Sequence, residues 1–435
     1  MLARLLLAGP FTVRESTLRI RSALGRCPHW LNRRLKTMVA ELGEGSRPRQ
    51  QRLQRMIHAD EGFQKAVHGK ALRFRQRPGN SVLCPAKGAP ETWTLPSLIS
   101  IQELSDYLGL TAGELEWFAD LKSLNPQSTE SRLQHYRYRW QPKIDGSARL
   151  IESPKSRLKH LQRLLLGTII NRIPPHEAAH GFRSGRSTRT FVAPHVGQEI
   201  VLRMDLRDFF PSITRARIIA LLLTAGHPEP IALRLAGICT SRVPSAVLEN
   251  RPPGRKSNPS ESFRLRKLFE TPHLPQGAPS SPALANLTAH RLDCRLTGLA
   301  TAAGAHYTRY ADDLVFSGGA EFARKVERFA HHVCVVAFEE GFEVHTRKTR
   351  IMRKSVSQRA AGLVINEGIR LPRKEVDSLK AILHNCARLG PTSQNHGAHP
   401  DFRAHLLGRI SHLSTIHATR AAKLRRDFDQ IDWSR

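Results

Sequence analysis

The chain has 435 residues, of which 40% are hydrophobic, so it is long enough for a well-buried core and two or three domains. Its 68 lysine and arginine residues exceed the 37 acidic residues and leave a formal net charge of +31, which predicts a polyanionic partner. No stretch reaches the roughly 18–20 apolar residues of a membrane span. The basic residues are also spread along the chain, so nucleic acid is favoured over a peripheral membrane surface.

The first 130 residues predict a basic, mostly helical N-terminal extension. Helical patterns cover Leu31 to Leu42 and the arginine-rich segment that follows it, and a loop region rich in Gly and Pro runs from Arg77 to Pro96. Further on, Thr111 precedes Glu114 by three residues, which is the spacing of a capping box at a helix start.

The extreme N-terminus is rich in arginine and poor in acids, which also suits an organelle transit peptide or a short signal. Pro10 and Glu15 interrupt its apolar run, so a first helix of the N-terminal extension is the preferred interpretation. The six cysteines have no paired spacing of the kind found in zinc sites or disulfide frameworks. They indicate ordinary thiols of a reduced, cytoplasmic protein.

Residues 131–370 change character, because short β-type runs alternate with helical segments and predict an α+β domain. The strand-like runs lie at 200–206, 306–318 and 360–371, and helical patterns lie at 215–226 and 281–296. Ser281 is expected to cap the last of these helices, with Pro282 at its first position. The basic segment between Thr240 and His273 predicts a surface loop or insertion. Residues 371–435 are helical again and predict a small appended domain.

Three aspartates carry the chemical signal. Asp205 ends one strand-like run, and Asp312 and Asp313 stand side by side in a strand-turn-strand pattern. Because neighbouring side chains of a strand point to opposite faces, two adjacent aspartates reach one site only at the twisted tip of a hairpin. Carboxylates that converge repel one another, and divalent magnesium relieves this repulsion. A bare Asp-Asp pair is usually a polar turn, so the interpretation depends on the motifs around it.

Those motifs resemble the reverse transcriptases. Tyr310-Ala311-Asp312-Asp313 is similar to their YADD box, and the segment from Asp205 to Phe210 resembles their first palm motif. Between the two, residues 273–286 are similar to the family's LPQG motif, and further similar blocks occur in the family's order at residues 148–155, 181–187, 348–349 and 360–366. The resemblance covers roughly Arg132 to the C-terminus.

The resemblance implies a right-hand polymerase: fingers and a palm with an antiparallel sheet flanked by helices at 131–370, and a helical thumb at 371–435. It implies RNA-directed DNA synthesis with two Mg²⁺ ions, which Mn²⁺ can replace, held by Asp205 and Asp312 with Asp313 in a supporting position. Lys348 matches a lysine that assists the departure of pyrophosphate.

For the incoming deoxynucleotide, the resemblance implies a binding role for Arg149, Phe210, Gln276, Gly277 and Tyr310. The ring of Phe210 would clash with a ribonucleotide 2′-hydroxyl, and the alternative is a buried core phenylalanine. Gly277 would let the backbone approach the substrate, and Arg149 would grip the triphosphate. Lys143 and Lys155 are either further triphosphate ligands or solvated surface lysines.

Among bacterial types, the chain most resembles retron reverse transcriptases. These copy part of a structured noncoding RNA, prime from an internal RNA 2′-hydroxyl to give branched RNA-linked DNA (msDNA), and act in antiphage defence, which implies an RNA–DNA hybrid and an effector protein as partners. Of the family's Asn-Ala-x-x-His motif only His195 is present, and this histidine is expected to be structural. Ala360-Ala361-Gly362 stands where retron enzymes have Val-Thr-Gly. The alternatives are a group II intron maturase, a diversity-generating or unassigned defence enzyme, and a catalytically idle RNA-binding scaffold.

Overall fold

The computed structural model describes residues 2–7, 10–24, 27–46, 48, 50–69, 95–128, 130–142, 148–252 and 259–433. Most of the loop expected between Arg77 and Pro96 therefore lies outside the described residues. The chain divides into two compact units, Met1–Pro174 with Phe210–Thr288 and Pro175–Phe209 with Ala289–Arg435. The predicted domains at 1–130, 131–370 and 371–435 follow chain order, and that division stays a prediction. Among the described helices, none is long and apolar enough to cross a membrane.

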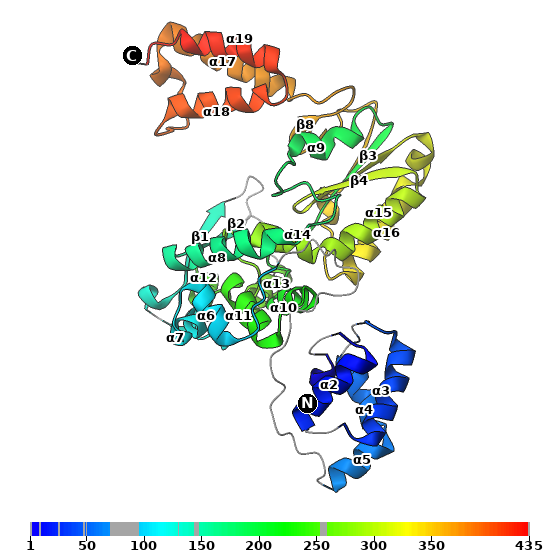
Figure 1. Ribbon diagram of the computed structural model, residues 1–435. Helices are drawn as coiled ribbons and strands as arrows, with labels where there is room; N and C mark the ends of the chain where they lie inside the picture. The colour runs from blue at the N-terminus through cyan, green and yellow to red at the C-terminus, as the bar shows by residue number, and fades with distance from the viewer. Residues whose placement is uncertain are drawn as a thin grey trace. The chain divides into compact units, whose positions relative to one another are not determined.

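The N-terminal helices lie together (Figure 1). They pack around a core of their own, which includes Phe11, Leu31 and Leu53. The apolar stripe of the third helix, with Leu31, Leu35 and Met38 fully buried, supplies much of this core. The helices are α1 (Leu2–Leu6), α2 (Val13–Leu24), α3 (His29–Leu42), α4 (Gln50–His58) and α5 (Glu61–His68).

The rest of the first unit combines helices with a β-hairpin. Strands β1 (Tyr136–Pro142) and β2 (Ala148–Pro154) pair antiparallel. The capping box predicted at Thr111 and Glu114 is present and begins α7. The helices are α6 (Ile101–Leu108), α7 (Ala112–Ala119), α8 (Ser156–Thr168), α10 (Arg215–Thr224), α11 (Glu229–Cys239), α12 (Ser245–Glu249), α13 (Pro259–Glu270) and α14 (Ser281–Thr288).

Two expectations for the segments between residues 240 and 296 need correction. The segment between Thr240 and His273 is not simply a loop, because it contains α12 and α13, and Phe269 of α13 is buried against Leu150 and Val243. Apolar residues at helical spacing in α13 outweigh the polar, basic composition that suggested a loop. The helical pattern at 281–296 forms two helices, since α14 ends at Thr288 and α15 (His290–Ala302) begins two residues later, in the second unit.

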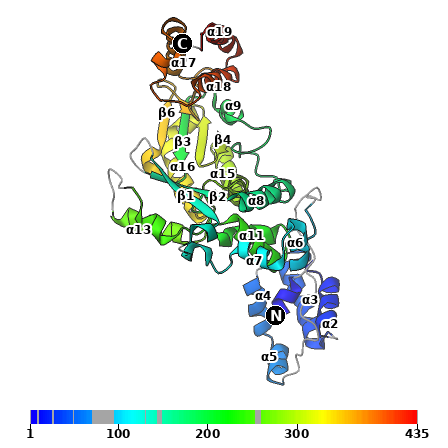
Figure 2. The same ribbon diagram turned by 90° about the vertical axis from the view of Figure 1, so that its left-hand side faces the viewer.

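An antiparallel sheet forms the centre of the second unit. Within the described residues it contains four strands in the order β4 (Ala305–Tyr310), β5 (Asp313–Gly318), β3 (Ile200–Asp205) and β6 (Arg350–Arg353). Figure 2 shows β3, β4 and β6 beside one another, with α16 (Ala320–Glu339) behind them. The residue pairing brings the end of β3 next to the start of β5.

Both faces of this sheet are covered, which explains why β3 and β5 are almost continuously apolar. Helices α15 (His290–Ala302) and α16 contact the strands on one face. A second cluster, which includes Phe191, Val201, Val315 and Leu363, joins the strands to α9 (Thr188–Val192) and to the small hairpin of β7 (Arg359–Ala360) and β8 (Leu363–Val364). The predicted mixture of helices with antiparallel strands is confirmed.

The C-terminal helices lie side by side (Figure 1). They form another apolar cluster, with Leu383, Leu406 and Phe428 among its buried residues. They are α17 (Arg373–Leu389), α18 (Phe402–Ser414) and α19 (Ala418–Asp429). The helical patterns predicted beyond residue 371 are therefore confirmed.

Candidate active site

Asp205 and Asp313 lie directly opposite each other on neighbouring strands. Asp205 is the last residue of β3, Asp313 is the first residue of β5, and the two are register partners. Asp312 lies in the turn that joins β4 to β5, and its carbonyl oxygen accepts a hydrogen bond of 2.8 Å from the amide of Leu206. The hairpin tip predicted for the Asp-Asp pair is present, and it lies beside the strand that ends at Asp205.

The turn between β4 and β5 contains strained backbone. Tyr310 pairs with Asp313, so the connection has the two residues Ala311 and Asp312, and tight turns of this kind need a positive φ at the first position. Ala311 takes a φ of 56°, which costs roughly 1–2 kcal/mol for a residue with a Cβ. Gly181 approaches the same turn so closely that a Cβ there would lie 2.8 Å from the amide nitrogen of Ala311. Strain of this kind often occurs at active sites.

Two cations hold two of the aspartates. Lys348 places its Nζ 3.0 Å from Oδ1 of Asp205. Arg203, two residues before Asp205 on β3, donates from Nε to Oδ1 of Asp313 at 2.7 Å. Burial, followed by repulsion from Asp205, raises the pKa of Asp312 to about 6. Burial also raises the pKa of Asp313, although Arg203 opposes this shift.

These carboxylates suit a divalent cation in part. Within the described ranges, no three His, Cys, Asp or Glu side chains gather closely enough to hold a metal ion together. Asp205 and Asp312 nevertheless supply the hard oxygen donors that such cations prefer. The pKa of Asp312 is raised first by burial and second by repulsion from Asp205, and a bound cation would relieve the second of these. Asp205 is paired with Lys348 and Asp313 is paired with Arg203, and the metal-ligand roles of all three aspartates stay predictions.

Tyr310, the first residue of the YADD box, lies in a row of aromatic rings. Its ring centroid is 5.6 Å from that of Phe191 and 6.1 Å from that of Phe182. Phe182, whose φ is 57°, is 53% exposed. Because of this exposure, its ring offers an aromatic surface to solvent beside the turn. Its place in the row suits stacking, and the predicted nucleotide-binding role of Tyr310 stays a prediction.

The LPQG segment of the first unit is built against β2. The amide of Glu152 donates to the carbonyl of Gln276 at 2.9 Å. Gly277 has a φ of 137°, and a Cβ there would lie 2.9 Å from the carbonyl oxygen of Glu152. The backbone of β2 therefore comes so close to residue 277 that only a glycine fits there. Nearby, Nε2 of His273 lies 3.0 Å from the buried Glu152 carboxylate. Burial by itself would lower the pKa of His273, but the Glu152 carboxylate outweighs burial, so the pKa of His273 is raised.

The remaining predicted nucleotide-binding residues also belong to the first unit. Phe210 is half-buried, and Arg149 on β2 is exposed. Lys155 donates from Nζ to the backbone carbonyls of Ser131 and Arg132, at 2.5 and 3.2 Å, so it stabilises the backbone. Lys143 lies outside the described residues.

His195 is buried between two hydroxyl groups of the sheet. Its Nδ1 lies 2.6 Å from Oγ of Ser317, and its Nε2 lies 2.8 Å from Oγ1 of Thr308. The Thr308 hydroxyl donates its hydrogen to the carbonyl of Phe191. The imidazole therefore donates from Nε2 to Thr308 and accepts at Nδ1 from Ser317. Burial lowers the pKa of His195 to about 3, so the ring is neutral and links β4 to β5.

Comparisons with known proteins agree with this geometry. A family model described as "Reverse transcriptase (RNA-dependent DNA polymerase)" matches residues 141–376. The Retron Mx65 reverse transcriptase of Myxococcus xanthus is 38% identical over 366 residues, which cover 83% of this chain and 78% of that protein. This chain belongs to the bacterial retron reverse transcriptases. As such, it is an RNA-directed DNA polymerase that copies an RNA template and depends on divalent metal ions.

Other relatives of this retron reverse transcriptase are more partial. The Retron Mx162 reverse transcriptase of Myxococcus xanthus is 38% identical over 305 residues, covering 67% of this chain and 59% of that protein. The Retron Ec86 reverse transcriptase of Escherichia coli is 31% identical over 238 residues, covering 54% of this chain and 65% of that protein.

Two features of the candidate site were not predicted from the sequence. Arg203 stands two residues before Asp205, and the alternation of a strand predicts that both side chains share a face, so this partner was detectable. The second is the buried pair of Asp293 and Arg309, which joins α15 to β4. An arginine inside a buried strand signals a hidden partner, but the sequence does not say which acid it is.

Proposed function

We propose that this enzyme extends a primer on its cognate noncoding RNA and makes RNA-linked single-stranded DNA (msDNA). The observation that carries the proposal is the register of Asp205 opposite Asp313, with Asp312 in the strained turn beside them. A catalytically idle scaffold would have no reason to keep a buried carboxylate whose pKa burial and a neighbouring aspartate raise to about 6.

Asp205 and Asp312 would hold Mg²⁺, with Mn²⁺ as a substitute, and Asp313 would support them. Two such ions supply activation of the 3′-hydroxyl and stabilisation of the leaving pyrophosphate. The chain's own contribution is to fix the carboxylates at the ends of paired strands before substrate binds. Lys348, already beside Asp205, would place its ammonium group near the leaving phosphate as a charge or a proton donor.

Residues of the first unit would receive the deoxynucleotide. The exposed guanidinium of Arg149 suits the triphosphate, and the half-buried ring of Phe210 suits a steric gate against the 2′-hydroxyl. Gln276 and Gly277 would form the wall of the nucleotide site that is fixed to β2. A nucleotide-binding role is also proposed for Tyr310.

The chain would work as a right-hand polymerase. The sheet of the second unit would be the palm, the β1–β2 hairpin would be part of the fingers, and α17 to α19 would be the thumb. The last two helices of this thumb carry basic residues that suit the phosphates of an RNA–DNA hybrid: Arg403, Arg409, Arg420, Lys423, Arg425 and Arg426.

The cellular role that we propose is antiphage defence together with an effector protein, as in retron systems, and the site of action is the cytoplasm. The similarity to the Retron Mx65 and Mx162 reverse transcriptases supports this proposal over a group II intron maturase or a diversity-generating enzyme.

Sequencing of the nucleic acid that co-purifies with the enzyme tests the proposal. We expect the wild-type chain, expressed with its flanking genomic DNA, to yield one DNA species joined to RNA through a 2′–5′ branch, which a debranching enzyme releases. The same cells with an Asp312→Asn variant are expected to yield the RNA alone. Unbranched DNA in the wild-type sample would contradict the retron proposal, and equal DNA in both samples would contradict the site.

A further inference from the structure

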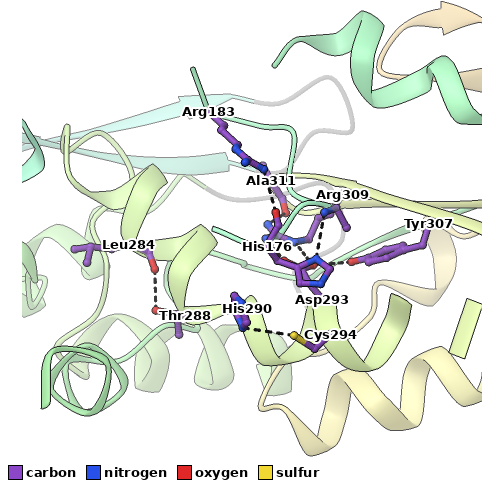
Figure 3. Close-up of polar contacts among 11 residues, drawn as sticks. His176, Arg183, Leu284, Thr288, His290, Asp293, Cys294, Tyr307, Arg309 and Ala311 are labelled. Atoms are coloured by element: carbon purple, nitrogen blue, oxygen red, sulfur yellow. Dashed lines mark hydrogen bonds and ion pairs between the residues drawn. The ribbon is translucent and has the colours of Figure 1, made fainter. Parts of the chain in front are cut away.

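A fully buried ion pair lies directly behind the catalytic turn. Arg309 of β4 donates from Nε to Oδ1 of Asp293 at 2.7 Å and from Nη2 to Oδ2 at 2.6 Å, and neither side chain is exposed to solvent. Tyr307 donates its hydroxyl to the same carboxylate at 2.8 Å. Figure 3 shows Arg309 and Tyr307 both directed at Asp293. Burial of two charges costs several kcal/mol per ion, so stability alone is a weak reason for this pair.

The same guanidinium also holds the turn. Nη1 of Arg309 donates to the carbonyl oxygen of Ala311 at 3.0 Å. Ala311 has the strained φ of 56°, and its carbonyl belongs to the peptide group that leads into Asp312. On the other side of Asp312, its own carbonyl accepts from the amide of Leu206 at 2.8 Å. The peptide groups before and after Asp312 are therefore both held, the first by Arg309.

The backbone of Arg309 is anchored as well. Its amide donates to the carbonyl of Ala178 at 2.7 Å, and its carbonyl accepts from the amide of His180 at 2.8 Å. Its guanidinium carbon lies 5.7 Å from the ring centroid of Phe209. Arg309 is thus fixed by its main chain, by Asp293 and by an aromatic face. A side chain fixed in this way can transmit the position of α15 to the turn.

We propose that Asp293 and Arg309 are positioning residues, which hold the Ala311 peptide so that the Asp312 carboxylate stays beside Asp205 despite their mutual repulsion. A planar guanidinium is suited to this task, because one edge binds the carboxylate while the remaining nitrogen reaches the carbonyl. The inference rests on the proposed metal-binding role of Asp312. An error of about 1 Å in the position of a catalytic group reduces the rate by roughly a hundredfold.

The test compares two variants of the full-length enzyme. Arg309→Lys keeps the positive charge next to Asp293 but has no rigid fork that also reaches Ala311. Tyr307→Phe is the matched control, since it removes one hydrogen bond to Asp293 and leaves the Arg309–Ala311 contact in place. For each variant we would measure thermal unfolding, kcat and KM for dTTP on poly(rA)/oligo(dT), the Mg²⁺ concentration at half-maximal rate, and Mn²⁺ binding without substrate by electron paramagnetic resonance.

We expect Arg309→Lys to lower kcat about tenfold to a hundredfold. It should also raise the half-saturating Mg²⁺ concentration and weaken Mn²⁺ binding, with KM for dTTP changed less than kcat. Tyr307→Phe should lower the melting temperature and leave the metal dependence and kcat near the wild-type values. Equal losses of kcat in both variants, in proportion to their loss of stability and with unchanged Mn²⁺ binding, would overturn the proposal.

A double variant, Asp293→Asn with Arg309→Gln, covers the case in which Arg309→Lys does not fold, because it leaves no unpaired buried charge. A folded double variant with wild-type kcat and Mn²⁺ binding contradicts the positioning role, and a folded one that is impaired in both supports it.

Asp312→Asn, measured in parallel, distinguishes a failure of the proposed metal site from a failure of the positioning role. If that variant stays active, the proposed site fails; if it is inactive while Arg309→Lys behaves as wild type, only the positioning role fails.

Discussion

Nζ of Lys348 lies 3.0 Å from Oδ1 of Asp205, although the lysine side chain is 47% exposed and the aspartate side chain only 16%. The lysine extends from the short 3-10 turn Thr346–Lys348, and the His345 amide just before this turn donates to the carbonyl of Asp205 at 2.7 Å. The main chain thus fixes the base of the lysine while its ammonium group stays at the surface. This arrangement suits a group that acts on a phosphate rather than one that stabilises the core.

Replacement of Lys348 by methionine should therefore affect the reaction more than the fold. We expect kcat to fall about a hundredfold or more, the usual contribution of a positioned proton donor or charge, with an unchanged melting temperature. Lys354→Met is the matched control, because Lys354 is also about half exposed and pairs with the exposed Glu199. Steady-state primer extension would measure both variants, and equal rates for the two would argue against a role for Lys348.

Phe210→Ala should relax the selection of the sugar. The half-buried ring is proposed to occupy the space of a ribonucleotide 2′-hydroxyl, so its removal should raise the incorporation of rNTPs relative to dNTPs. Single-nucleotide incorporation with matched dNTP and rNTP pairs measures this ratio. Phe338→Ala, at a 79% exposed position of α16, is the control and should leave the ratio unchanged. The same ratio in Phe210→Ala and in the wild type would refute the gate.

Gly277→Ala should destabilise the enzyme. The new Cβ would lie 2.9 Å from the backbone oxygen of Glu152, at a φ of 137° that side chains rarely adopt. A conformation of this kind costs about 1–3 kcal/mol, apart from the steric clash. Gly298→Ala is the control, because nothing lies within 4 Å of its Cβ position in α15, and a helix gains roughly 0.5–1 kcal/mol from this change. Urea unfolding would compare the two, and a Gly277→Ala enzyme as stable as Gly298→Ala would contradict the packing described.

Acid should destabilise the fold in part through His195. Its folded pKa of about 3 lies below the unfolded value of about 6.5, so the unfolded chain takes up this proton first as the pH falls. The stability that this residue contributes is present above pH ~6.5 and decreases by about 2 kcal/mol between pH ~6.5 and ~5. His195→Gln should show a correspondingly weaker dependence of the unfolding free energy on pH over this range. If the unfolding free energies of the variant and the wild type changed equally with pH, the neutral, hydroxyl-bound state of the His195 imidazole would be contradicted.

Local patterns explain which parts of this fold could be predicted. The capping box of Thr111 and Glu114 and the hairpin tip at Asp312 depend on residues that are close in the sequence, so composition and spacing were enough. The contacts between Arg309 and Asp293 join a strand to a helix, and Gly277 faces a strand more than a hundred residues earlier. Such pairings are decided by packing, and one sequence holds no signal that selects a particular distant partner.

The basic segment between Thr240 and His273 shows how composition can mislead. Its prolines and charges are typical of loops, whereas Leu265 and Phe269 of α13 pack towards Trp140 and Leu150. Burial of these apolar side chains outweighs the weak helix preference of the polar residues around them.

The most direct test of the central claim is RNA-templated primer extension by the purified enzyme with dNTPs and Mg²⁺, compared with an Asp312→Asn variant of equal melting temperature. The arrangement of Asp205 and Asp312 predicts extension by the wild type that stops when EDTA removes the metal, and extension at background level by Asp312→Asn at every Mg²⁺ concentration. Undiminished extension by a folded Asp312→Asn enzyme would contradict the assignment of the catalytic site.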